Sequence, residues 1–180
     1  MGKVAITDHN FPSVNIEREI IESAGFQLEE VKPICTTEMD IIHKCVDADV
    51  LLVQWAPVTR QVLESLPRVK CIVRYGVGVN NFDLEAARDL GVVAANVPDF
   101  CIEEVSDHAL AMMLSLCRRI PQDHNQIIDG GWGINRFRPM PAFSELTLGL
   151  VSFGKIAREL ARKAKAIGFK AIAFDPLVED

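Results

Sequence analysis

A loop near the end of the sequence has the residue types and spacing to hold a phosphate group. It reads Ser152-Phe153-Gly154-Lys155-Ile156-Ala157 and follows an apolar run at 147–151. The usual dinucleotide fingerprint is G-x-G-x-x-G or G-x-G-x-x-A, in which the middle glycine lets a pyrophosphate approach the backbone. Gly154 supplies that glycine and Ala157 is an accepted third member, whereas Ser152 stands where the first glycine is expected. The pattern predicts a dinucleotide-binding turn with one departure.

The departure sets a condition on the backbone. The first glycine of the fingerprint turns the chain out of its strand, and serine can do so only with a backbone conformation allowed to L-residues. We therefore expect an ordinary φ at Ser152. The backbone N–H groups of Lys155 and Ile156 are then expected to point at the pyrophosphate from the N-terminus of a helix.

An acidic residue completes this constellation. Asp175 follows a helical pattern at 155–167 and a second strand pattern at 169–174, and Pro176 comes next. An acid in this place accepts hydrogen bonds from a ribose 2′-hydroxyl and repels a 2′-phosphate, so it favours NAD over NADP. We assign an NAD site to these residues: Ser152, Phe153, Gly154, Lys155, Ile156, Asp175 and Pro176. The alternative is an ordinary βαβ crossover with a helix cap.

A second glycine-containing loop follows the strand pattern at 70–75. Gly76 and Gly78 permit a turn whose N–H groups converge on one point, which suits a carboxylate. Ligands of open α/β sheets bind at the carboxyl ends of the strands, where this loop lies. A purely structural glycine turn is the alternative. The candidate substrate-binding residues are Arg74, Tyr75, Gly76, Val77 and Gly78.

Alternating strand and helix patterns position the second loop. The predicted strands are 3–7, 27–31, 50–55, 70–75 and 92–97. The predicted helices between them are 13–24, 37–46, 59–66 and 81–90. This alternation, with short connections, implies a parallel sheet covered on both faces. Residues 1–98 are therefore predicted to form a flavodoxin-like α/β domain.

Residues 99–180 are predicted to form a second, partial domain, because the alternation breaks at Val97-Pro98-Asp99. A long apolar helix is expected over 103–119, buried against something large, and Pro121 is expected to end it. Residues 121–146 are interpreted as an arm that is either disordered or packed on a partner. We favour the partner, because Trp132 and Phe137 are unfavourable in water.

The pattern at 147–174 predicts the first βαβ unit of a Rossmann NAD-binding domain. Two parallel strands cannot bury both faces of their sheet alone. We therefore expect four apolar side chains to be partly uncovered, namely Val151, Phe153, Ile172 and Phe174. The chain is expected to be oligomeric or partly disordered beyond about residue 145.

Composition excludes several functions. The formal net charge of −6 disfavours non-specific binding to nucleic acid or to an anionic membrane. The basic side chains of 155–167 are interpreted as a solvated face, and no apolar run is long enough to span a bilayer. The 5 cysteines and 4 histidines lack metal-ligand spacing, so no metal site is predicted. Free, buried thiols are typical of a cytoplasmic protein.

Several runs in order resemble the D-isomer-specific 2-hydroxyacid dehydrogenase family, which includes phosphoglycerate dehydrogenase and the C-terminal-binding-protein corepressors. The resemblance lies in 72–87, 96–110, 147–157, 164–169 and 174–176. It implies that residues 1–98 bind a small 2-hydroxy or 2-keto acid. It also implies a homodimer formed through 103–146, with Val77 and Gly78 near the substrate carboxylate and nicotinamide, and with Lys155, Ile156 and Asp175 holding NAD.

The family transfers a hydride between the 2-carbon of a 2-hydroxy acid and nicotinamide. The resemblance places its carboxylate-binding arginine and its histidine–glutamate pair beyond residue 180, so we assign no catalytic residue in this chain. The chain is interpreted as C-terminally truncated, with no turnover of short 2-keto acids expected from it alone. Asn80 and Glu145-Leu146, like Ser152, depart from the family pattern. The alternatives are a non-catalytic dinucleotide-sensing or corepressor-like dimeric module and a degenerate paralogue that only dimerises.

Overall fold

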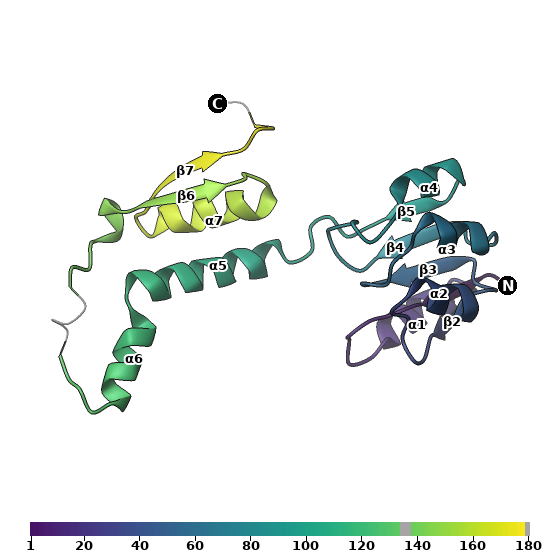
Figure 1. Cartoon of the computed structure of the whole chain (residues 1–180), viewed down its shortest axis with the longest axis horizontal. Coiled ribbons are helices and arrows are strands. Elements are labelled where there is room, and N and C mark those ends of the chain that lie inside the picture. The colour runs from purple at the N-terminus through teal and green to yellow at the C-terminus, as the bar shows by residue number, and fades with distance from the viewer. Residues whose placement is uncertain (134–137, 179–180) are drawn as a thin grey trace. The chain divides into compact units, whose positions relative to one another are not determined.

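The computed structural model describes residues 1–133 and 138–178, which fall into two compact units (Figure 1). The first unit is Met1–Phe100 and the second is Cys101–Asp180. The predicted boundary lay after residue 98. Each unit has its own sheet and is described by itself.

The first unit contains a five-stranded parallel sheet, as the sequence predicted. Its strands have the spatial order β2-β1-β3-β4-β5, which is one of the two common orders of doubly wound sheets. The strands are β1 (Lys3–Ile6), β2 (Gln27–Glu30), β3 (Val50–Val53), β4 (Cys71–Arg74) and β5 (Val93–Ala95). The helices are α1 (Asn15–Ser23), α2 (Glu38–Lys44), α3 (Arg60–Ser65) and α4 (Leu84–Asp89).

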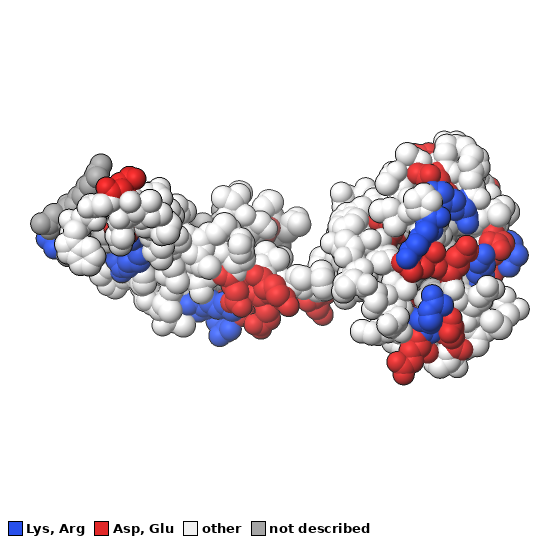
Figure 2. Space-filling model, turned by 90° about the horizontal axis from the view of Figure 1, so that it is seen from below, with Lys and Arg blue, Asp and Glu red and all other residues white. Residues whose placement is uncertain are grey.

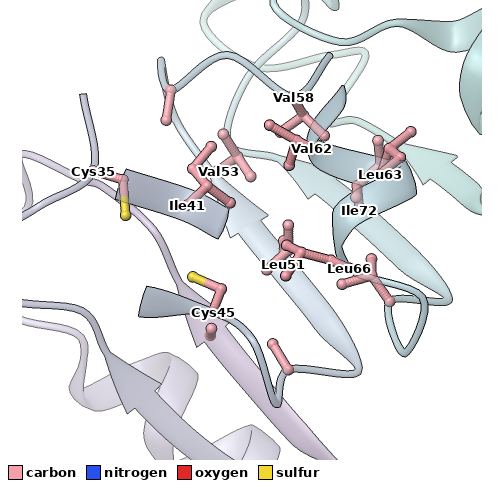
Figure 3. Packing of buried hydrophobic residues seen from close by; sticks show 14 of the residues in the cluster. Cys35, Ile41, Cys45, Leu51, Val53, Val58, Val62, Leu63, Leu66 and Ile72 are labelled. Atoms are coloured by element: carbon pink, nitrogen blue, oxygen red, sulfur yellow. The ribbon is translucent and has the colours of Figure 1, made fainter. Parts of the chain in front are cut away.

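Alternation along the strands gives this unit two separate cores. Ala5, Leu51 and Ile72 face a cluster with the side chains of α2, α3 and α4, and Figure 3 shows its central members. Val4 and Ile6 face the opposite side, where they join Val14 and Leu28 beside α1. Successive side chains of a strand point to opposite faces, so each strand contributes to both cores. The sheet is thereby covered on both faces, as expected for parallel strands.

The second unit has less regular structure to cover its sheet. Two parallel strands, β6 (Thr147–Val151) and β7 (Lys170–Phe174), flank the crossover helix α7 (Lys155–Ala166). The long helix α5 (Ile102–Cys117) packs on α7. Lys163 of α7 fixes that contact, because its ammonium donates to the hydroxyl of Ser106 at 2.8 Å and to the carboxylate of Asp107.

The predicted end of the long helix was only half right. α5 ends at Cys117, but a further helix, α6 (Ile120–Ile128), begins almost at once, and a short 3-10 turn covers Phe143–Glu145. Pro121 opens α6 instead of stopping the chain. A proline in the first turn is favourable, because the N–H that it lacks has no partner there in any case. The break is made by Arg119, whose φ of 56° is left-handed.

Apolar side chains of the second unit are widely exposed. α5 was expected to be buried, but only Ser106 is fully buried along it, and Leu116 is 70% exposed. Trp132 is 91% exposed, and Phe137 lies outside the described residues. On the sheet, Val151 is 92% exposed, and Ile172 and Phe174 are also largely exposed while Phe153 is half-buried, which confirms that this sheet is uncovered.

Charges of both signs are mixed on the first unit, as the face in Figure 2 shows. The second unit presents more uncharged surface in the same view. Within the described ranges, no helix has the length and apolar character to cross a bilayer, and no three potential metal-ligating side chains gather in one place. Cys35 and Cys45 are buried in the first core, whereas the other three cysteines are half-buried.

Candidate functional site

The glycine loop leaves β6 through a strained residue. Ser152 has a φ of 83°, which corrects our expectation of an ordinary backbone conformation. Its N–H donates to the carbonyl oxygen of Phe174 at 2.8 Å, so the chain is still paired with β7 as it turns. Left-handed backbone costs an L-residue about 1–2 kcal/mol. Serine therefore occupies a glycine conformation without the freedom of glycine, and tertiary hydrogen bonds hold it there.

Gly154 lies at the start of α7 in an unstrained conformation. Its φ is −73° and its ψ is −171°, values that any residue can adopt. Among the described residues, no heavy atom lies within 4 Å of a Cβ built at this position. Neither conformation nor internal packing therefore requires glycine here. The open side faces outward at the N-terminus of α7, where backbone N–H groups favour an anion.

Asp175 is brought directly onto this loop. Its carboxylate accepts a hydrogen bond from the Phe153 N–H at 2.7 Å and one from the Leu177 N–H at 2.9 Å. These backbone donors hold the pKa of the Asp175 carboxyl below its usual value, with help from the Ser152 hydroxyl and the charge of Arg158. A carboxylate has about four acceptor positions, so this one retains capacity for a hydroxyl donor.

Side chains of α7 complete the surroundings of the loop. Arg158 donates from Nε to the carbonyl oxygen of Phe153 at 2.8 Å, and its guanidinium lies 5.4 Å from the centre of the Phe153 ring. Ile156 is 36% exposed at the start of the helix. The structure thus brings the predicted cofactor residues 152–156 and 175–176 together in one loop cluster of the second unit.

The substrate loop of the first unit follows β4. The Tyr75 N–H donates to the Val53 carbonyl at 2.9 Å, which extends the pairing of β3 and β4. Gly76 has a φ of 140°, and its N–H donates back to the Arg74 carbonyl at 3.0 Å. That bond corrects the expected nest, because the Gly76 N–H is turned inward. Only the N–H groups of Val77 and Gly78 remain for an external carboxylate.

Arg74 supplies the positive charge at this loop. Its guanidinium folds over the turn so closely that a Cβ on Gly76 would collide with it. Within the part of the chain that the structure describes, its Nε is buried without a hydrogen-bond partner and the side chain forms no ion pair. An unpaired guanidinium above a glycine turn can receive a carboxylate through charge-assisted hydrogen bonds.

One residue of this edge was missed from the sequence. Asp8, directly after β1, is 2% exposed. Its carboxylate accepts from the N–H groups of Gln54, Trp55 and Ala56 at 3.1, 2.6 and 3.2 Å and from the Thr7 hydroxyl at 2.7 Å. These bonds fasten the loop after β3 to the end of β1. An acid directly after a buried strand was the available signal.

The chain belongs to the D-isomer-specific 2-hydroxyacid dehydrogenase family. Residues 4–172 match the family described as "D-isomer specific 2-hydroxyacid dehydrogenase, catalytic domain". The chain is 34% identical over 179 residues to the D-3-phosphoglycerate dehydrogenase of Methanocaldococcus jannaschii, which covers 99% of this chain and 33% of that protein. It is 35% identical over 143 residues to the enzyme of the same name from Synechocystis, covering 79% and 26%. The chain therefore spans about a third or less of these relatives.

Solved structures agree with this assignment. A putative D-isomer-specific 2-hydroxyacid dehydrogenase from Polaromonas has a TM-score of 0.80 and 25% identity, covering all of this chain and 57% of that one. The apo D-lactate dehydrogenase of Escherichia coli has a TM-score of 0.69 and 28% identity, covering 99% and 56%.

Proposed function

We propose that the protein carrying this sequence is an NAD-dependent oxidoreductase that transfers a hydride between NAD(H) and a small 2-hydroxy or 2-keto acid. In this proposal the first unit is a flavodoxin-like substrate domain and the second begins a Rossmann NAD-binding domain. The described residues bind and orient, while none of them is assigned as the acid–base catalyst. A cytoplasmic location remains a prediction.

The observation that carries the proposal is the combination of Gly154 and Asp175. A glycine that neither its conformation nor its neighbours require leaves an open approach to the N-terminus of α7. The acid that closes the same loop is held ionised by backbone donors. A pyrophosphate at the helix terminus and a ribose hydroxyl at the acid match these two groups. NAD would supply the hydride acceptor or donor.

Arg74 and the turn after it are proposed to hold the acid substrate. The carboxylate would lie between the guanidinium and the outward N–H groups of Val77 and Gly78. The His9–Glu30 pair is not assigned as acid–base catalyst, although its side chains are 2.9 Å apart. Both ring nitrogens of His9 are occupied, because Nδ1 accepts from the Phe11 N–H at 3.1 Å while Nε2 faces Glu30.

A homodimer formed through 103–146 is proposed as the assembly. Its support is the exposed apolar surface of α5 and α6, where Leu116, Ile127 and Ile128 are 70%, 59% and 68% exposed. Apolar surface of this extent marks an interaction site on a protein of ordinary composition.

The test of the cofactor site uses two matched substitutions. Gly154→Ala and Gly149→Ala each add one methyl group in open space within the second unit. We expect Gly154→Ala to weaken NADH binding at least tenfold, because the methyl group blocks the pyrophosphate, and to leave the unfolding midpoint unchanged. Gly149→Ala should leave NADH binding unchanged. Titration calorimetry at high protein concentration measures both.

Equal NADH affinity of the Gly154→Ala variant and the parent chain would refute the cofactor site. Tighter binding of NADPH than of NADH would refute the assigned role of Asp175. NADH binding without turnover by the whole protein would favour the alternative, a non-catalytic dinucleotide-sensing module, which the strained Ser152 also favours.

A further inference from the structure

Aromatic side chains gather at the carboxyl edge of the first sheet. The ring of Phe11, in the loop after β1, stacks on His9 with centroids 5.7 Å apart. Its other side meets the ring of Tyr75, after β4, edge-on at 5.1 Å. Trp55, in the loop after β3, is 53% exposed. Because β1, β3 and β4 are neighbours in the sheet, these loops share one edge. We call Phe11, Trp55 and Tyr75 the aromatic rim.

The aromatic rim is held rigid by its own backbone. Asp8 grips the N–H groups of residues 54–56. The side chains of Asn10 and Gln54 also bridge the two loops, since Gln54 accepts from the Asn10 N–H at 2.9 Å and donates to the Asn10 side chain at 3.1 Å. Preorganised loops lose little conformational entropy when a ligand binds. The rim is therefore built before any ligand arrives.

The positive charges near the aromatic rim are already neutralised, apart from one. Lys32 pairs with Glu30 at 3.1 Å, and the same carboxylate takes His9. Arg60, after the β3 loop, pairs with Asp89 at 2.8 Å. Among the described residues of this edge, only Arg74 lacks an anionic partner. One guanidinium can satisfy one carboxylate, whereas a phosphorylated acid carries a second anionic group that needs its own donors.

We infer that the aromatic rim selects a 2-keto or 2-hydroxy acid with an aromatic or large apolar side chain over a phosphorylated one. This inference rests on the proposed function, since Arg74 is taken to hold the carboxylate. The side chain of the acid then lies against the aromatic rings, where it gains apolar contact and stacking. The named relatives are phosphoglycerate dehydrogenases, so the inference separates this chain from them in substrate.

The experiment compares two acids on the 180-residue chain by ligand-observed NMR titration. The probes are D-phenyllactate and 3-phospho-D-glycerate. We expect D-phenyllactate to bind at least tenfold more tightly. Trp55→Ala should weaken its binding about tenfold, and Phe11→Leu should weaken it less, because leucine keeps the apolar bulk. Trp132→Ala removes the other tryptophan, 91% exposed in the second unit, and should change nothing.

Each remaining outcome has a defined meaning. Equal affinity for the two acids, tighter binding of 3-phospho-D-glycerate, or full affinity in both rim variants would overturn the inference. Arg74→Gln should weaken both acids alike, so acid binding that survives this change would overturn the carboxylate site of the proposed function and this inference with it. Loss of NADH binding in the Gly154→Ala test concerns the second unit alone and is read separately.

Discussion

The two units solve the problem of a parallel sheet differently. In the first, β1, β3 and β4 each lie between two hydrogen-bonded neighbours, and Leu51 and Ile72 are fully buried. In the second, β6 and β7 have only each other, and Val151 at the end of β6 is 92% exposed. A parallel sheet must be covered on both faces. The first unit therefore meets the requirements of an independent fold, whereas the second depends on further surface to cover it.

The largest expected effect tests that difference directly. Leu51→Ala should reduce the free energy of unfolding of the first unit by about 3 kcal/mol, because it leaves a cavity in a packed core. Val151→Ala, also in a strand, should change the stability of the second unit by less than about 0.5 kcal/mol. Urea denaturation of each variant measures both. Similar losses for the two variants would mean that β6 is as well packed as β3.

An intermediate effect is expected at the proposed dimer surface. Leu116→Lys places a charge at an exposed apolar position of α5 and should weaken dimerisation roughly 30-fold, or about 2 kcal/mol. Sedimentation velocity over a range of concentrations measures the shift. Ile16→Lys is the control, because Ile16 is 74% exposed but lies on α1 of the first unit. A monomeric parent chain at all concentrations would contradict the dimer.

The smallest effect concerns the strained serine. Ser152→Gly should stabilise the second unit by about 1 kcal/mol, because glycine adopts a φ of 83° without steric cost. The loss of the long 3.4 Å contact from the Ser152 hydroxyl to Asp175 offsets little of this. Thermal unfolding measures the change, and Ser144→Gly, whose φ is not left-handed, should not stabilise. A destabilised Ser152→Gly variant would show that the hydroxyl matters more than the strain.

The strands of both units could be predicted because short β-branched runs and turn residues mark them locally. Helix starts were less certain, since they depend on capping. α2 begins after Thr37, which exchanges hydrogen bonds with Asp40 in a capping box. These bonds, with the nearby Lys44 ammonium, lower the pKa of the Asp40 carboxyl, chiefly through the Thr37 hydroxyl. α6 was missed because Pro121 has the same local appearance whether it ends a helix or opens one.

The candidate sites were predictable where the glycines mark them, but their hydrogen bonds were not. The backbone partners of Asp8 lie 46 to 48 positions away in the sequence, so only the assembled sheet brings them together. The conformation of Ser152 is likewise set by bonds to β7, which override its intrinsic preference. Local patterns give the residue types of a site, whereas tertiary contacts decide which of its groups remain available.

Asp8 has a consequence for how this protein can change. It holds residues 54–56 through their main-chain N–H groups, which are the same for nearly every amino acid. The identities of side chains 54 and 55 are therefore released from the task of shaping their own loop. New acids can be accommodated by replacing those side chains while the frame stays intact, so this edge is a natural starting point for redesigning substrate preference.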